Sequence, residues 1–294
     1  MRTTTRVAGG LPEQGGAADQ PPAPSPPSSA PKKSGLAALR NRLYWGASDM
    51  MAVTQRNLIA YTRIPEMLMF SSIQPIMFVL LFRYVFGGAI PVPGYRYVDY
   101  MMPGIFVQTV CFGAMATGIG LAEDLGKGVV ERFRSLPMAR SAVMAGRTTA
   151  DLFRNIFVVL LMTVVGVAVG FRSGTGFFNF MGGVFLLLAF AYALSWGSVL
   201  IGLKARNAET AQAMAFPLLM PLTFASSAFA PVQSMPGWLQ AFARNQPVSV
   251  VIDACRDLMV GGPIPGSTWK AVAWTVGMLA VFFPLAVRGY RRAR

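Results

Sequence analysis

Six long apolar runs constrain this chain more than any other feature. A helix needs about 20 mainly apolar residues to cross a bilayer, and such runs occupy residues 67–86, 98–122, 150–171, 176–203, 210–230 and 268–287. Only 13% of the residues are charged, and the charges lie mainly between and beyond the runs. The pattern predicts an all-α polytopic membrane protein with six transmembrane helices. The net charge of +14 therefore does not indicate a nucleic-acid-binding protein.

The residues before the first run have a different composition. Residues 1–35 are rich in Pro, Ala, Gly and Ser without apolar periodicity, so they cannot bury enough apolar surface to offset the entropy of ordering. We expect a disordered cytoplasmic tail without a secretory signal, followed by one transmembrane domain over residues 36–294. Residues 39–63 mix apolar and basic side chains with Trp45. This composition predicts a helix on the inner membrane surface, or else an ordinary linker helix.

The distribution of basic residues predicts the orientation of the chain, because lysine and arginine resist translocation. If both termini are cytoplasmic, 20 of the 26 lysine and arginine residues lie on the inner side. The segment between the second and third runs is then also cytoplasmic. Arginine outnumbers lysine and alanine and glycine are abundant, which indicates a bacterial source and so a multi-pass protein of the bacterial cell membrane.

The segment between the last two runs contains two short amphipathic stretches, MPGWLQAFAR and QPVSVVIDACRDLMV. Each has apolar residues at helical spacing, but each is too short to cross a bilayer. We therefore predict an extracytoplasmic re-entrant helical hairpin before the sixth span.

The usual machinery of catalysis is missing from the sequence. The chain has no histidine, and Cys111 and Cys255 lie in unrelated contexts, so zinc sites and His-dependent catalytic groups are excluded. No carboxylate falls in the middle of a predicted span, which disfavours an ion-coupled carrier and leaves an intramembrane enzyme only as an alternative. Without a GxxxxGK[ST] phosphate loop, any ATPase must be another polypeptide. We predict no catalytic residue, metal site or cofactor in this chain.

The loop between the second and third runs contains an amphipathic helix. Its apolar stripe consists of Leu125, Val129, Phe133 and Leu136, and Pro137 ends it. Such a helix can lie on the membrane as a simple connection or dock in a groove on a cytoplasmic partner. Just after it, Arg147, Asp151 and Arg154 have the spacing of a helical ion ladder. The alternative is a charge that gates the substrate.

Two segments carry a resemblance to a known family. GKGVVERFRSLPMARSAVMAGR, residues 126–147, followed by TTADLFRN, resembles the signature segment of the ABC-2 type exporter permeases, in particular the daunorubicin-resistance branch. MPGWLQAFARNQPVSVVIDACRDL resembles the segment before the last span of that family, where many members have an adjacent Asn-Pro pair. Here Gln246 separates Asn245 from Pro247.

The resemblance covers residues 43–288 and implies a permease subunit that forms a homodimer. It also implies pairing with two copies of a separate ATP-binding cassette protein, which would bind ATP and Mg²⁺. The helix before the first span would be the elbow helix of the family. The helix after the second span would be the coupling helix, and its ATPase-coupling residues would be Leu125, Val129, Glu131, Arg132, Phe133, Arg134, Ser135, Leu136 and Pro137.

Two groups of large side chains are candidates for the substrate pathway. Met102 and Phe106 recur at a spacing of four, as do Phe216, Met220 and Phe224, so each group offers one polarizable or aromatic face. Such faces suit a hydrophobic drug or a lipid, although the same pattern often serves only helix packing. The predicted function is export of a hydrophobic drug, antibiotic or lipid. The resemblance also leaves open a lipid-linked glycan as the exported substrate.

Overall fold

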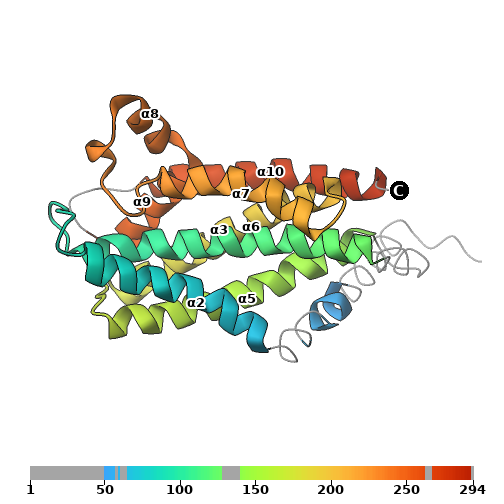
Figure 1. Ribbon diagram of the computed structural model, residues 1–294, viewed down its shortest axis with the longest axis horizontal. Helices are drawn as coiled ribbons and strands as arrows, with labels where there is room; N and C mark the ends of the chain where they lie inside the picture. The colour runs from blue at the N-terminus through green and yellow to red at the C-terminus, as the bar shows by residue number, and fades with distance from the viewer. Residues whose placement is uncertain (1–49, 57–58, 60–64, 128–139, 262–266, 293–294) are drawn as a thin grey trace, which may run out of the picture.

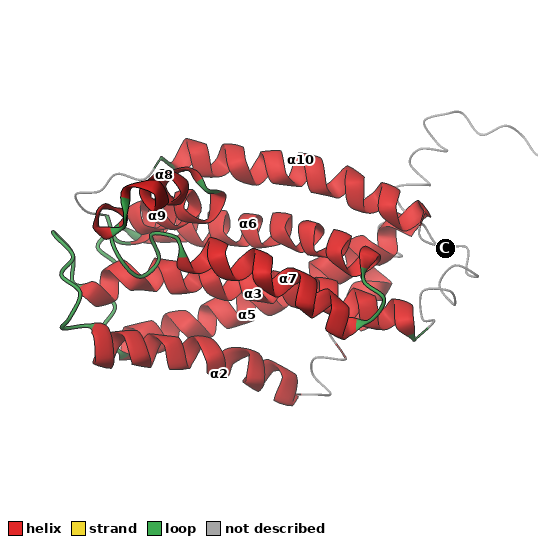
Figure 2. Cartoon of the chain, turned by 45° about the horizontal axis from the view of Figure 1, so that its top comes forward, coloured by secondary structure: helices red, strands yellow, loops and turns green. Residues whose placement is uncertain are grey.

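The computed structural model describes residues 50–56, 59, 65–127, 140–261 and 267–292. All regular structure in these residues is helical (Figure 2). The elements are α2 (Pro65–Leu81), the π-helical turn η1 (Phe82–Phe86), α3 (Tyr97–Gly126), α5 (Arg140–Ala168), α6 (Phe177–Lys204), α7 (Ala208–Phe224), the 3₁₀ turn η2 (Val232–Ser234), α8 (Gly237–Asn245), α9 (Pro247–Met259) and α10 (Thr268–Arg292).

The long helices lie side by side along the longest axis of the molecule (Figure 1). Successive helices run in opposite directions, so that the ends of α3, α6 and α10 lie at one end of the bundle. The loops after η1 and α5 lie at the opposite end, together with α8 and α9. Each predicted apolar run overlaps one of these helices, the first run matching α2 together with η1, but α7 ends at Phe224, before the end of its run.

Four helices are long and apolar enough to cross a membrane. They are α3, residues 144–168 of α5, α6, and residues 268–290 of α10. Residues 72–86 of α2 and η1 form a shorter apolar stretch. α7 has 17 residues and contains Pro217 and Pro221. The described part of the chain is therefore a helical bundle, and its helices have the apolar composition of a multi-pass membrane protein.

α3 is the central helix of the bundle and is buried along most of its length. It packs most extensively against α6, where Gly118 of α3 faces Gly202 of α6. A Cβ atom at Gly202 would collide with the backbone oxygen of Gly118, and one at Gly118 would collide with the Ser198 carbonyl. The two backbones therefore approach closely, as at other small-residue contacts between membrane helices.

The outer surface of α5 is apolar. Phe153, Phe157, Leu160, Val164 and Val167 are all exposed and recur every three or four residues, so they form one stripe along the helix. A stripe of this kind on a water-soluble protein would be an exposed hydrophobic patch prone to association. Contact with lipid chains or with another membrane helix explains it.

α8 and α9 form the predicted pair of short helices. α9 packs against α3, α6 and α10, whereas α8 stands away from the bundle at one end (Figure 1). Gln246 has an extended backbone conformation between the two helices, and Pro247 begins α9, where a proline costs no helical hydrogen bond.

The described part of the predicted surface helix, residues 50–56, is helical and lies against the start of α5. Thr54 Oγ1 donates a hydrogen bond to the Gly146 carbonyl at 3.1 Å, and Val53 is buried beside Gly146. The rest of the predicted helix, including Trp45, lies outside the described residues.

Candidate functional site

The predicted coupling segment joins the end of α3 to the start of α5. Leu125 is half-buried near the end of α3. The other predicted coupling residues lie outside the described residues, namely Val129, Glu131, Arg132, Phe133, Arg134, Ser135, Leu136 and Pro137. The contacts of this segment therefore stay a prediction, while the two helix ends that hold it are described.

An ion pair connects those two helix ends. Arg147 of α5 pairs with Asp124 of α3, and both side chains are less than one-third exposed. Arg147, which was expected to belong to an ion ladder along α5, thus pairs with a residue of another helix. Because the pair is sheltered from solvent, it is screened less than a surface pair. It holds the ends of the 128–139 segment together.

A second polar cluster lies deeper between the same helices. Asp151 of α5 is 2% exposed and accepts a hydrogen bond from Thr117 of α3. The Arg154 Nε atom lies 3.7 Å from an Asp151 oxygen, and Arg154 Nη2 donates to the Gly113 carbonyl at 2.6 Å. The candidate span of α5 begins at residue 144, so this charged pair lies inside it. Buried charges of this kind in a membrane helix mark functional sites by default.

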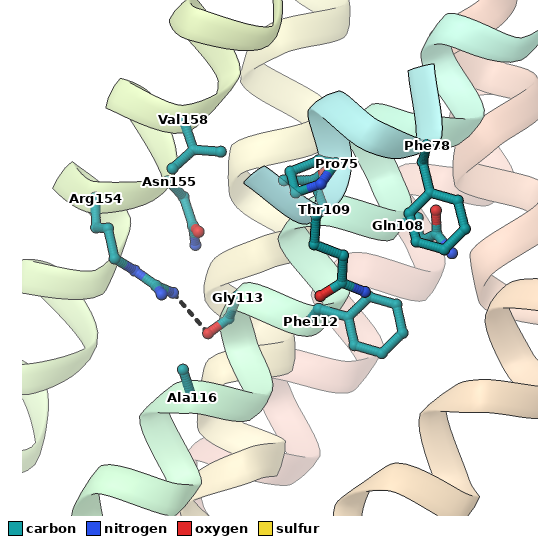
Figure 3. A pocket seen from close by; sticks show the side chains of 11 residues that line it. Pro75, Phe78, Gln108, Thr109, Phe112, Gly113, Ala116, Arg154, Asn155 and Val158 are labelled. Carbon is teal, nitrogen blue, oxygen red and sulfur yellow. Dashed lines mark hydrogen bonds between the residues drawn. The ribbon is translucent and has the colours of Figure 1, made fainter. Parts of the chain in front are cut away.

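A cavity of about 140 Å³ lies next to this cluster, between α2, α3 and α5. Figure 3 shows Arg154 and Asn155 projecting from α5 toward Gly113, with Phe78 and Phe112 on the other side. Gln108 and Asn155 are each 3% exposed, whereas Gln74 and Ala116 are exposed. The cavity is thus lined by buried amides and half-buried aromatic rings, with exposed residues of α2 and α3 at its mouth.

An aromatic cluster adjoins this cavity. Phe78 lies 6.2 Å from Phe224 of α7 and 6.1 Å from Phe82 of η1, measured between ring centroids. Phe229, in the segment after α7, stacks on Phe82 at 4.2 Å and lies 5.6 Å from Phe224. Phe224, a predicted pathway residue, therefore lies one ring away from the cavity.

The other predicted pathway residues fall into two separate places. Met102 and Phe106 are buried in the core, where the Met102 methyl group packs against Gly166 and Phe106 contacts Phe171 edge to face. Phe216 and Met220 are exposed on α7. In the described chain no ring contact joins Phe106 to Phe216 or Phe224, and a role for these positions in a substrate pathway stays a prediction.

Arg256 of α9 is a functional candidate that the sequence reasoning missed. It is 1% exposed, lies 3.7 Å from the centre of the Tyr100 ring and donates to the Tyr100 carbonyl at 3.1 Å. It also donates to the Ser227 carbonyl at 2.7 Å and to Asp253 at 2.6 Å. These bonds fix α9 to α3 and to the segment after α7.

The sequence also contained a signal for the cavity that the sequence reasoning missed. Gln74, Gln108 and Asn155 are amide side chains, and each interrupts a different apolar run. Polar residues in membrane helices usually face the interior of the bundle. Isolated amides in these runs were therefore a signal for positions inside the bundle, although they do not show which helices face one another. Within the described chain, no group of three His, Cys, Asp or Glu side chains is placed to hold a metal ion.

Comparison with known proteins places the chain in a family. The sequence profile of the ABC-2 type transporter family matches residues 48–260. The chain belongs to the ABC-2 type transporter family. This match runs from just before the 50–56 helix to the end of α9, and it includes the segment between α3 and α5. Together with its apolar helices, the membership makes the chain a multi-pass membrane protein.

Several permeases resemble this ABC-2 family member over most of its length. The daunorubicin resistance ABC transporter permease protein DrrB1 of Streptomyces coeruleorubidus is 33% identical over 236 residues, which cover 80% of this chain and 83% of the relative. The probable doxorubicin resistance permease DrrC of Mycobacterium tuberculosis is 28% identical, with 74% and 79% covered. The putative transport permease ycf38 of Porphyra purpurea is 27% identical, with 71% and 72% covered.

Proposed function

We propose that this chain is the permease subunit of an ABC exporter that moves a hydrophobic drug, antibiotic or lipid out of the cytoplasm or inner leaflet. The observation that carries the proposal is the 33% identity to a daunorubicin resistance permease over 80% of the chain. In the proposed complex, the chain forms a homodimer and two copies of a separate ATPase bind ATP and Mg²⁺. The complex lies in the bacterial cell membrane.

The proposed topology has six spans with both termini in the cytoplasm. α2 with η1 comprises residues 65–86, which as a helix would measure about 33 Å at 1.5 Å per residue and so reach across the hydrocarbon core. α7 is shorter, and the apolar segment that follows it would complete its crossing. The position of α9 against α3, α6 and α10 supports a re-entrant hairpin, and the 50–56 helix would belong to the proposed elbow helix.

The proposed mechanism transmits ATPase motion through the segment between α3 and α5. Closure of the ATPase dimer would push on residues 125–137, including Glu131, Phe133 and Arg134. The ion pair between Asp124 and Arg147 supports this role, because it makes the two helix ends move together. The 50–56 helix contacts Gly146, next to that pair. The push would therefore bias the bundle between inward-open and outward-open states.

Reconstitution tests the proposed function. The chain and its cognate ATPase are placed together in proteoliposomes, and ATP-dependent movement of daunorubicin is measured by its fluorescence. A parallel preparation carries a fluorescent phospholipid whose transfer between leaflets is measured by chemical quenching. We expect one of the two to move only when ATP and Mg²⁺ are present. If neither moves although the assembled ATPase hydrolyses ATP, the proposed function is wrong.

The coupling residues are tested in the same system with the double variant Phe133→Ala and Arg134→Glu. We expect normal membrane insertion and ATPase binding in detergent, but loss of most ATP-dependent transport. The matched control is Arg172→Glu, since Arg172 is exposed in the loop between α5 and α6, and this loop lies at the opposite end of the bundle (Figure 1). Transport at the wild-type rate by a correctly assembled double variant would refute the coupling role.

A further inference from the structure

Two amide groups in the wall of the cavity between α2, α3 and α5 lack a partner within the chain. Gln108 Nε2 and Asn155 Nδ2 are buried and have no hydrogen-bond partner, and both residues line the cavity. Arg154 Nε also lacks a hydrogen bond, but it lies 3.7 Å from Asp151 in an ion pair. Most buried polar groups in folded proteins are hydrogen-bonded, and each exception calls for a specific explanation. Two such amides in one cavity wall indicate that the cavity accepts a ligand with a hydrogen-bond acceptor.

The charge balance of the cavity wall narrows the chemistry of that acceptor. Arg154 is already paired with Asp151 and bonded to the Gly113 carbonyl, so the wall has no large excess of positive charge. An uncharged acceptor oxygen fits this wall better than an anion, whose desolvation would need a full countercharge. An amide can turn to present either its N–H or its oxygen, whereas the Nε of an arginine only donates. Because the amides can present their N–H groups and Arg154 adds only donors, the wall as a whole favours an acceptor oxygen.

The size and lining of the cavity set the shape of the ligand. A cavity of about 140 Å³ is close to the volume of roughly 150 Å³ that holds one benzene molecule, so it accepts about one ring or a short chain end. Phe78 and Phe112 supply aromatic walls. Drug-sized ligands occupy pockets of about 300–1,000 Å³, so most of such a molecule would extend out past Gln74 and Ala116.

We propose that this cavity binds the carbonyl-bearing end of an amphipathic molecule, with Gln108, Arg154 and Asn155 donating to its oxygen atoms and Phe78 and Phe112 packing on its apolar part. The carbonyl belongs either to a ring of a planar drug or to the ester of a membrane lipid. The proposal concerns binding by the permease, and it stands whether or not the bound molecule is exported.

Binding to the full-length permease in lipid nanodiscs tests the proposal without the ATPase. Daunorubicin, whose ring carries carbonyl oxygens, is the drug probe, and binding is followed by its fluorescence. Native mass spectrometry of the same preparation detects retained phospholipid as the second arm. The variants Gln108→Leu and Asn155→Leu each remove one amide at nearly constant volume, and Asn179→Leu, at an exposed position on α6, is the matched control.

We expect daunorubicin or a retained phospholipid to bind about three- to tenfold more weakly to each cavity variant, as loss of one hydrogen bond predicts. The control should bind like the wild type. Ala116→Trp, at the exposed mouth, should block the same ligand without removing a buried group. Loss of daunorubicin binding identifies a drug site, and loss of phospholipid identifies a lipid site. If all three cavity variants bind both probes like the wild type, the proposal is wrong.

Discussion

Arg256 shows how a single residue fixes an element that cannot cross the membrane by itself. Its guanidinium group bonds to the Tyr100 and Ser227 carbonyls and to Asp253, and its flat face rests on the Tyr100 ring. Both carbonyls lie in other elements of the fold. A guanidinium group suits this position because its planar donors can reach several acceptors at once.

Replacing this arginine should therefore loosen α9. Arg256→Met keeps much of the volume but leaves the two buried carbonyls without these donors, and each buried acceptor left unsatisfied costs about 1–3 kcal/mol. Unfolding can be followed with a thiol-reactive dye, because Cys111 and Cys255 are both buried and free. We expect a clearly lower melting temperature for the variant.

The control for this prediction is Arg244→Met, because Arg244 is exposed on α8. Surface substitutions of this kind usually change stability by no more than about 0.5 kcal/mol. Equal melting temperatures for the two variants would contradict the role of Arg256.

Gln246 gives a second case in which one residue connects distant segments. Its amide donates to the Leu222 and Ala225 carbonyls at 2.9 Å each, near the end of α7 where helical carbonyls lack partners. The residue that separates Asn245 from Pro247 therefore has a structural role. The sequence could show that Gln246 departs from the family pattern, but not why, because its acceptors are backbone atoms of another helix.

At the scale of elements, the contact between α3 and α6 depends on Gly118 and Gly202. Gly202→Ala would place a Cβ atom against the Gly118 backbone, where neither backbone can give way easily. Overpacking of this kind costs about 1–3 kcal/mol. We expect a lower melting temperature in the thiol-dye assay and weaker assembly of the bundle.

Gly182→Ala is the matched control on the same helix, since a Cβ atom there meets nothing within 4 Å. Alanine favours a helix over glycine by up to about 1 kcal/mol, so this variant should be as stable as the wild type or more so. If both alanine variants behave alike, close backbone approach does not hold α3 to α6.

The sequence was sufficient to predict that the long helices exist. It was less informative about where each helix begins and ends and about which of its faces packs against a neighbour. Long apolar runs predicted each long helix, but α5 begins at Arg140 while its apolar run begins at residue 150. An apolar run marks the part of a helix that is in contact with lipid or with the protein core. The helix itself can continue beyond that run into polar surroundings. Asp151 and Arg154 consequently lie well inside α5.

At the scale of the whole molecule, the candidate site was the part that sequence reasoning could not assemble. α3 and α6 are apolar on nearly all sides, so their composition does not indicate which face meets which neighbour. The cavity depends on that choice, because Gln108 and Asn155 line it from different helices. The ABC-2 family was recognisable from the segment after α3, since that resemblance rests on local sequence and needs no packing information.

The six-span topology makes a prediction about the whole molecule that two exposed positions can test. Arg206 lies between α6 and α7, and Ser234 lies between α7 and α8, so they are on opposite sides of the membrane only if α7 and the segment after it cross. In intact cells, a membrane-impermeant maleimide should label Ser234→Cys and should label Arg206→Cys only after the membrane is opened. The native cysteines are buried and should remain unlabelled in both variants. Labelling of both positions from the same side would show that α7 does not cross, and the number of spans would then be wrong.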